Sequence, residues 1–224
     1  MKTEGTHMDE LTGLLNRREF MERFGDAIVK ARSGQRETPL SLALLDVDKF
    51  LLVNEEYGHK AGDQMLVAVA DCLRQQAGNK ALIGRYGGDE FVIVFPATER
   101  EQAFLKMEQI RQELSRQELV TADGKTIPGI FISGGVASFP VDGRTENELF
   151  RKADHALYRA KSSGREQIRL AFEERMLPKT SHYTQTQLER LSRLADERKV
   201  SEADLLREAM DDFLTKYGVN DIET

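Results

Sequence analysis

The sequence predicts an α/β sandwich followed by a small pair of helices. Helical and strand-like patterns alternate up to about Leu170 with a hairpin pattern in the middle, which is typical of layered α/β domains. Beyond Leu170 the pattern changes to a charged, Pro-containing connection and then to two helical patterns. We therefore expect a first domain over residues 9–170, a linker over 171–179 and a helix-helix module over 180–218.

The first half of the chain alternates between helical and strand patterns. Asn16 to Arg32 has a helical pattern, and Leu40 to Val47 reads as a buried strand. Apolar residues at helical spacing then predict a helix over Asp63 to Gln76. The runs Ala81 to Ile83 and Phe91 to Phe95 read as two strands joined through Gly87-Gly88, because both glycines can take the positive φ that a tight hairpin turn requires.

The second half continues the alternation. We expect a helix over Glu99 to Glu118, one strand-like segment over Ile127 to Ser138, and a helix opened by the capping box Thr145-x-x-Glu148. Gly164 is the expected stop of that helix. The tail predicts helices over Gln185 to Arg198 and from Ser201 onward, and their forty residues are too few for a stable core of their own.

The composition is that of a soluble globular protein. The net charge of −6 argues weakly against nonspecific binding along a nucleic-acid backbone, which depends on clustered Lys and Arg. The one cysteine, Cys72, lies in an apolar helical pattern and is expected to be buried. No run approaches the ~20 apolar residues that span a bilayer, and the polar N-terminus lacks a signal-peptide core, so we expect a cytoplasmic protein without membrane contact.

Two acidic pairs indicate the chemistry. Asp89 and Glu90 follow the glycine pair at the hairpin tip, and Asp46 and Asp48 end an apolar strand, where alternation points both to the same face. Acids at two strand ends can share a hard cation. Two carboxylate clusters with few other ligands suit Mg²⁺, which keeps part of its water shell and takes substrate phosphate oxygens as further ligands. Phosphoryl or nucleotidyl transfer is therefore the first hypothesis.

The signature at the glycine pair and four further motifs, in this order along the chain, resemble the GGDEF family of diguanylate cyclases over about Asp9 to Ile168. They are Asp9-x-Leu11-Thr12-Gly13-Leu14-x-Asn16-Arg17-Arg18, Asp46-x-Asp48-x-Phe50 with Asn54-x-x-Tyr57-Gly58-His59-x-x-Gly62-Asp63, Gly87-Gly88-Asp89-Glu90-Phe91, and Ala153-Asp154-x-Ala156-Leu157-Tyr158-x-Ala160-Lys161-x-x-Gly164-Arg165. The resemblance implies a palm-like nucleotide-cyclase fold with a mostly antiparallel central sheet. It also implies a homodimer that condenses two GTP into cyclic di-GMP and releases pyrophosphate, with one GTP on each subunit.

The resemblance implies a role for each acidic position. Asp46, the backbone carbonyl of Val47, and Asp89 would hold Mg²⁺, for which Mn²⁺ can substitute. Asp89 would also be the base that takes the proton from the ribose 3′-hydroxyl, and Glu90 would support the site. A carboxylate beside a metal ion is ionised at neutral pH, which suits this chemistry. The alternative is an acidic turn at a solvated hairpin tip.

The family pattern also implies a set of substrate-binding residues. Guanine recognition would fall to Asn54 and Asp63, although Asp63 could instead only cap the following helix. His59 would lie on the substrate side or be structural. Lys161 and Arg165 would bind the triphosphate. Their alternative role is only to place favourable positive charge at a helix C-terminus. Phe50 completes the expected set.

Three positions depart from the family pattern. Leu51 stands where the family commonly has a lysine that neutralises phosphate charge, which predicts slow turnover. Gly78 and Ala81 stand where the Arg-x-x-Asp motif of product inhibition would fall, so we expect no such feedback site. Glu166 replaces the usual asparagine, with no consequence that the sequence indicates.

The tail is similar to ribbon-helix-helix modules of small DNA-binding repressors. That resemblance implies a dimer whose short strand over residues 180–184 enters the major groove, with Thr180 and His182 toward DNA and Ser181 and Tyr183 inward. The segment from Leu177 to Thr224 contains seven Lys or Arg and ten Asp or Glu. Its net charge of −3 disfavours contacts with DNA phosphates. Dimerisation is therefore the preferred role over DNA binding, and a helical hairpin that packs on its own first domain is a third possibility.

Two alternatives to a diguanylate cyclase stay open at this point. The first is a non-catalytic receptor or transcription regulator that binds GTP or cyclic di-GMP and signals through the tail. Intact Asp46, Asp89 and Glu90 favour catalysis, whereas Leu51 and the tail are compatible with the receptor hypothesis. The second is an enzyme that joins ATP to GTP. Asp63 argues against it, because a carboxylate accepts from the N1 and N2 donors that guanine has and adenine lacks.

Overall fold

The computed structural model describes residues 7–33, 36–121, 124–171, 180–198 and 201–217. The chain divides into two compact units, residues 1–173 and 174–224, which we describe separately. The predicted linker over 171–179 lies almost wholly outside the described residues. Within the described ranges, every helix is too short or too polar to cross a membrane.

The first unit is built on a five-stranded sheet in the order β2-β3-β1-β6-β7. The strands are β1 (Leu40–Val47), β2 (Leu82–Gly87), β3 (Glu90–Pro96), β6 (Ile132–Phe139) and β7 (Ile168–Leu170). All neighbours pair antiparallel except β6 and β7, which are parallel. The prediction of a mostly antiparallel central sheet is confirmed.

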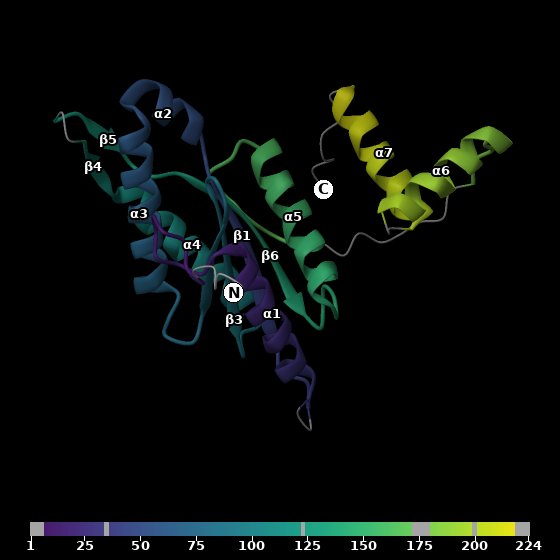
Figure 1. Ribbon diagram of the computed structural model, residues 1–224, viewed down its shortest axis with the longest axis horizontal. Helices are drawn as coiled ribbons and strands as arrows, with labels where there is room; N and C mark the ends of the chain where they lie inside the picture. The colour runs from purple at the N-terminus through teal and green to yellow at the C-terminus, as the bar shows by residue number, and fades with distance from the viewer. Residues whose placement is uncertain (1–6, 34–35, 122–123, 172–179, 199–200, 218–224) are drawn as a thin grey trace, which may run out of the picture. The chain divides into compact units, whose positions relative to one another are not determined.

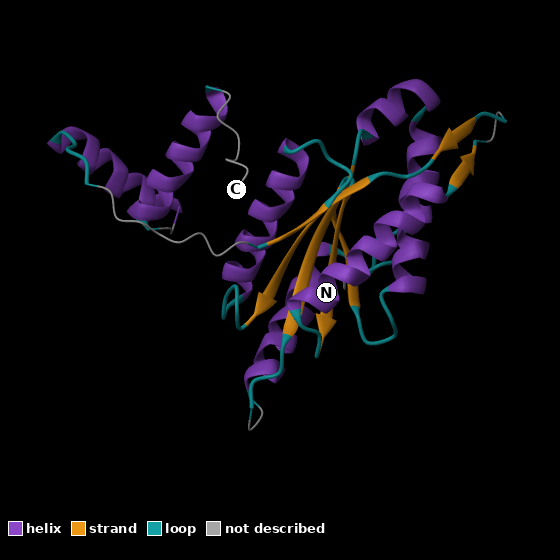
Figure 2. Ribbon diagram, turned by 180° about the vertical axis from the view of Figure 1, so that it is seen from behind, coloured by secondary structure: helices purple, strands orange, loops and turns teal. Residues whose placement is uncertain are grey.

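Helices cover both faces of this sheet (Figures 1 and 2). One face packs on α1 (Arg17–Arg32) and α5 (Glu146–Ser162), and the other on α3 (His59–Gln76) and α4 (Arg100–Arg116). Successive residues of β1 alternate between the two cores, so that Leu42 and Leu44 contact one core while Ala43 and Leu45 contact the other. Burial on both faces explains why β1 is apolar along its whole length.

Several helix boundaries agree with their sequence signals. Asn16 caps α1 by accepting from the backbone N–H of Glu19 at 3.0 Å. The capping box of Thr145 and Glu148 opens α5, as predicted. The short α2 (Phe50–Tyr57) was not expected, and Gly58, at φ 84°, separates it from α3. Asp63 therefore lies inside α3, and the alternative in which it only caps that helix is wrong.

The expected single strand over Ile127 to Ser138 is also wrong. β5 (Thr126–Pro128) instead pairs with β4 (Glu118–Val120) in a separate two-stranded sheet, and β6 begins at Ile132. Gly129 breaks the run because it has φ 76° and donates its N–H to Gln117 O at 3.0 Å. The predicted helix over Glu99 to Glu118 ends earlier, at Arg116, because Glu118 begins strand β4.

The hairpin of β2 and β3 forms as predicted, but its glycines do not act as expected. Gly88 and Asp89 make the turn, and the pairing register shifts between Arg85 and Gly87. Neither glycine of the pair adopts a positive φ. A β-bulge, and not a left-handed turn residue, therefore adjusts the chain at this tip.

The second unit contains α6 (Gln185–Arg198) and α7 (Glu202–Lys216), close to the predicted ranges. Thr184 opens α6, because its hydroxyl accepts from Gln187 N at 3.3 Å and its own N–H donates to Gln187 Oε1 at 2.9 Å. Among the described residues of this unit, only Ala195 and Leu205 are buried apolar side chains. Residues 180–184 lie in no strand and are exposed.

Candidate active site

The two acidic pairs meet where the central strand joins the hairpin. In the pairing of β1 with β3, Asp46 lies opposite Glu90, and Val47 donates its backbone N–H to Asp89 O at 3.1 Å. Backbone pairing, and not side-chain packing, therefore places Asp46 beside the hairpin tip. Asp89 is partly buried at that tip and Glu90 is exposed.

Asp46 carries the strongest electrostatic perturbation of this edge. Its residue is only 8% exposed, and its Oδ2 lies 2.6 Å from the Lys161 ammonium at the end of α5. Burial raises the pKa of Asp46 to about 6. The hydrogen bond and charge of Lys161 oppose this rise, and the charges of Asp89 and Asp48 add to it. At neutral pH the carboxylate is mostly ionised and paired with the lysine.

Asp48 has a different environment from Asp46. Ser133 Oγ lies 2.9 Å from both of its carboxylate oxygens, and the backbone N–H of Glu166 donates to Oδ2 at 3.1 Å. The Arg165 guanidinium lies farther away, with Nε 3.9 Å from Oδ1. Asp48 is thus a buried acceptor that anchors the connection from α5 to β7, and sequence reasoning missed both Ser133 and the Glu166 backbone.

A further set of residues holds the hairpin tip. Arg85 donates from Nε and Nη2 to Gly88 O at 3.0 and 2.7 Å, and from Nη1 to the Asp9 carboxylate at 3.1 Å. Asp9 also accepts from the backbone and hydroxyl of Thr12 at 2.8 and 2.6 Å. We call Asp9, Thr12 and Arg85 the tip clasp. Asp9 and Thr12 belong to the motif Asp9 to Arg18, whereas Arg85 lies two positions before the glycine pair and was not predicted to be a site residue.

The predicted guanine-binding residues come from α2 and α3. Gly62 permits the contact, because a Cβ at this position would lie 2.1 Å from Asn54 Oδ1 and 3.1 Å from the Phe50 ring. Asn54 therefore packs directly against the helical turn that carries Asp63, while Phe50 is partly buried against the core. His59 is exposed in the first turn of α3.

Asp63 borders a shallow hollow on the outer face of α3. Its other lining residues are Leu11, Gln64, Val67, Ala68 and Asp71. A carboxylate at the edge of apolar side chains can accept from a planar base that packs on them. Leu11 belongs to the motif Asp9 to Arg18, which predicts no site role for it.

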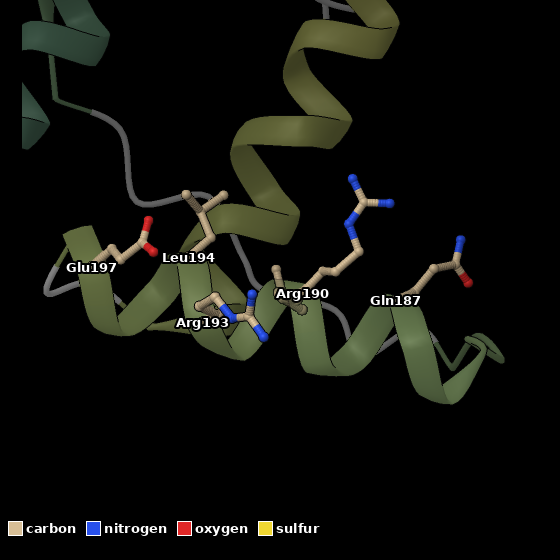
Figure 3. A pocket seen from close by; sticks show the side chains of 6 residues that line it. Gln187, Arg190, Arg193, Leu194 and Glu197 are labelled. Carbon is tan, nitrogen blue, oxygen red and sulfur yellow. The ribbon is translucent and has the colours of Figure 1, made fainter.

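A second hollow lies on α6 in the other unit and contains none of the predicted site residues. It is lined by Gln187, Arg190, Leu191, Arg193, Leu194 and Glu197. Figure 3 shows Leu194 among the polar side chains of this helix. Because all of these residues come from one helix, this hollow is an uncovered helix face and not an enclosed pocket.

The carboxylates fit a magnesium ion that draws its other ligands from substrate. Among the described residues, no three His, Cys, Asp or Glu side chains gather closely enough to hold a metal by themselves. Mg²⁺ needs only one or two protein carboxylates when water and phosphate oxygens complete its shell. The Lys161 ammonium against Asp46 marks a position where a cation is favourable.

The fold and this acidic edge together define a palm-like domain of the nucleotide-cyclase type. Residues 6–167 match the family described as "Diguanylate cyclase, GGDEF domain". The chain therefore belongs to the GGDEF family.

Relatives and solved structures agree with this assignment. The chain is 37% identical over 160 residues to the response regulator PleD of Caulobacter vibrioides, covering 71% of this chain and 35% of PleD. It is 37% identical over 164 residues to the diguanylate cyclase DosC of Escherichia coli, covering 73% of this chain and 35% of DosC. It thus spans about a third of the length of these two relatives.

Among solved structures, the GGDEF domain of DgcB from Caulobacter crescentus in complex with c-di-GMP superposes with a TM-score of 0.69. That domain is 32% identical to this chain, and the match covers 74% of this chain and 96% of that one. The active GGEEF domain of a diguanylate cyclase from Vibrio cholerae has a TM-score of 0.66 at 32% identity, covering 72% and 99% of the two chains.

Proposed function

We propose that this protein is a diguanylate cyclase, which condenses two GTP molecules into cyclic di-GMP and releases two pyrophosphates. The observation that carries the proposal is the pairing of β1 with the hairpin, which places Asp46 beside Asp89 at one edge of the sheet. Both carboxylates are retained where the family pattern requires them, and Asp46 is mostly ionised at neutral pH because its pKa is about 6.

Each acidic residue has a role in the proposed reaction. Asp89 takes the proton from the ribose 3′-hydroxyl of one GTP, whose oxygen attacks the α-phosphorus of the other as pyrophosphate leaves. Asp46, the Val47 carbonyl and Asp89 hold Mg²⁺ or Mn²⁺, and Glu90 supports the site. When bound, the metal stabilises the attacking oxygen and the phosphate charge.

The substrate residues divide by the part of GTP that they contact. Asn54 and Asp63 recognise guanine, and the hollow bordered by Asp63, Leu11 and Val67 offers the base an apolar surface. Phe50 and His59 lie on the two helices of this region. Lys161 and Arg165 bind the triphosphate from the end of α5 and the connection that follows.

The second unit acts in this proposal as a homodimerisation module. Its described residues leave large hydrophobic side chains exposed, among them Leu188, Leu194, Met210, Phe213 and Tyr217. A unit with so little buried surface gains stability from a second copy. If each cyclase domain carries one GTP, a dimer raises the effective concentration of the two halves. DNA binding through a ribbon-helix-helix arrangement is the less favoured role, because acidic residues predominate in this segment.

Chromatography of the reaction products tests the main proposal. Purified protein is incubated with GTP and Mg²⁺, with ATP added in a parallel sample. We expect cyclic di-GMP from the wild type, none from Asp89→Ala, and wild-type yield from Asp26→Ala, an exposed carboxylate on α1. Wild-type protein that binds GTP or cyclic di-GMP without making product would overturn the proposed cyclase activity.

That outcome would favour the non-catalytic receptor. One observation supports it, since Leu51, in the first turn of α2, is 68% exposed and carries no charge where the family commonly has a lysine. Restoring a cation with Leu51→Lys separates the two functions. A cyclase gains turnover from the added charge, whereas a receptor stays inactive.

Guanine selectivity has its own test. We expect Asp63→Ser to loosen the preference for GTP over ATP by about tenfold or more, because the serine hydroxyl cannot accept from both N1 and N2 donors as the carboxylate does. Asp71→Ser, at the other end of the same hollow, is the matched control. Unchanged selectivity in Asp63→Ser would remove Asp63 from guanine recognition.

A further inference from the structure

Lys161 and Asp46 form an ion pair that the proposed reaction does not by itself explain. The Lys161 ammonium lies 2.6 Å from Asp46 Oδ2, yet the proposed function assigns Asp46 to the metal and Lys161 to the triphosphate. While the ammonium occupies Asp46 Oδ2, that oxygen cannot also bind the metal, and the lysine is held away from other anions. The pair must therefore loosen for both assignments to be met in full.

The environment of the pair shows which side chain is able to move. Asp46 extends from the buried end of β1 and its side chain is 11% exposed, whereas the Lys161 side chain is 34% exposed in the last turn of α5. Lysine carries its charge on a flexible four-carbon stem, and an aspartate on a central strand has a short one. The lysine is therefore the partner that leaves.

The neighbouring charges explain why a cation resides there at all. Asp89 and Asp48 both lie near enough to Asp46 for their charges to affect it. Three carboxylates in a partly buried site repel one another unless a positive charge lies among them. Lys161 supplies that charge when no metal ion does.

We propose that Lys161 is a resident counter-ion of the metal site, which a divalent cation displaces from Asp46 and thereby releases toward the triphosphate. This inference rests on the proposed function. Displacement links the two binding events, because a metal that has removed Lys161 leaves an unpaired ammonium for the phosphates, and phosphates that hold Lys161 leave Asp46 open to the metal. Without nucleotide, the lysine competes with the metal and weakens its binding.

Arg165 provides a matched comparison within the same region. Its Nε lies 3.9 Å from Asp48 Oδ1, and its side chain is 51% exposed. The Asp48 carboxylate is already bound by Ser133 and by the Glu166 backbone. Removing Arg165 therefore lowers the positive charge of the region without opening a metal ligand.

Direct measurement of Mn²⁺ binding by electron paramagnetic resonance tests the inference on the full chain without nucleotide. We expect Lys161→Met to bind Mn²⁺ about tenfold more tightly than the wild type, and Arg165→Met to differ from the wild type by about twofold or less. With a non-hydrolysable GTP analogue present, the advantage of Lys161→Met disappears, because the analogue draws the lysine away in the wild type. Thermal unfolding of each variant checks that it is folded.

Two results would overturn the inference. Mn²⁺ binding in Lys161→Met that equals or falls below that of the wild type would mean that the lysine does not compete. An equal gain in Arg165→Met would mean that general electrostatics, and not occupation of Asp46, sets the affinity. Cyclic di-GMP production by the same wild-type sample separates this failure from failure of the proposed function. A wild type and a Lys161→Met variant that bind no Mn²⁺, with no product formed, would refute both.

Discussion

At the scale of single residues, the tip clasp connects the N-terminal motif to the hairpin. Arg85 binds Gly88 O and the Asp9 carboxylate at once, so one guanidinium joins two segments that are far apart in the chain. Its side chain is 17% exposed and that of Asp9 is 23% exposed. A partly buried, multiply bonded ion pair of this kind stabilises a fold more than a fully exposed pair does.

The clasp predicts a pH-dependent effect of Asp9→Asn. Desolvation raises the pKa of Asp9, but the hydrogen bonds from Thr12 and Arg85 and the charge of Arg85 outweigh it and lower the pKa below 3.8. Asp9 therefore stabilises the fold above its unfolded-state pKa, and this contribution is lost as the pH falls through the folded-state pKa. We expect Asp9→Asn to lose about 1 kcal/mol at pH 7, about 2–4 °C in melting temperature.

Thermal unfolding as a function of pH measures this effect. The difference between Asp9→Asn and the wild type should shrink as the pH falls below about 4. Asp26→Asn, on the exposed face of α1, should have the melting temperature of the wild type at both pH 7 and pH 3. A penalty for Asp9→Asn that stays constant down to pH 3 would contradict the ionic contribution of the clasp.

Cys72 gives a second prediction at this scale. It is 2% exposed in the core, and burial, assisted by the charge of Glu113, raises the pKa of its thiol to about 11. At pH 8 only about 0.1% of such a thiol is thiolate, the reactive form. We expect Ellman's reagent to leave the native protein unlabelled and to label one thiol in guanidinium chloride. Rapid labelling of the native protein would show that the core around α3 opens.

At the scale of elements, the connection from α5 to β7 contains a run of successive residues with positive φ. Gly164, Arg165 and Glu166 have φ values of 107°, 65° and 54°, so three successive residues lie in the left-handed region. Such a φ is unfavourable for a long side chain. The bond from Arg165 N to Ala160 O and the bond from Glu166 N to Asp48 hold the segment in this conformation.

Substitution of Glu166 tests this strain. We expect Glu166→Asn to stabilise the protein by about 0.5–1 kcal/mol, because asparagine tolerates the left-handed region better than glutamate does. Glu166→Gln removes the same charge without that preference and should bring no gain. Chemical unfolding measures both variants. Equal stabilisation by Gln and Asn would assign the effect to charge and not to the backbone.

At the scale of the whole molecule, the second unit is expected to control the oligomeric state. We predict that Met210→Glu with Phe213→Glu converts a dimer to a monomer, because both side chains are more than half exposed on α7 and a charge at each opposes apolar association. Light scattering coupled to size-exclusion chromatography measures the mass. Leu105→Glu, on α4 of the first unit and 66% exposed, is the control.

Two outcomes would contradict this dimer prediction. Wild-type protein that is already a monomer at micromolar concentration would leave the module without the proposed role. A double variant that remains a dimer would place the interface elsewhere. In either case the proposed cyclase activity would not depend on dimerisation through the second unit.

Much of the fold was predictable because its signals are local. The apolar run of β1, the cap of α1 and the capping box of α5 each lie within a few residues, and each element forms where those residues indicated. The elements that were missed or merged depend on single backbone conformations. Gly58 separates α2 from α3 and Gly129 separates β5 from β6, and a sequence does not reveal which of its glycines takes a positive φ.

The sequence by itself determined the class of the domain and the residues of its acidic edge, because motif order and strand alternation are properties of the chain alone. Only the tertiary structure decided how those residues are partnered. Ser133 bonds Asp48 across 85 positions and Arg85 bonds Asp9 across 76, and Lys161 of α5 pairs with Asp46 of β1. Contacts between distant positions arise from the packing of sheet and helices, which no local pattern encodes.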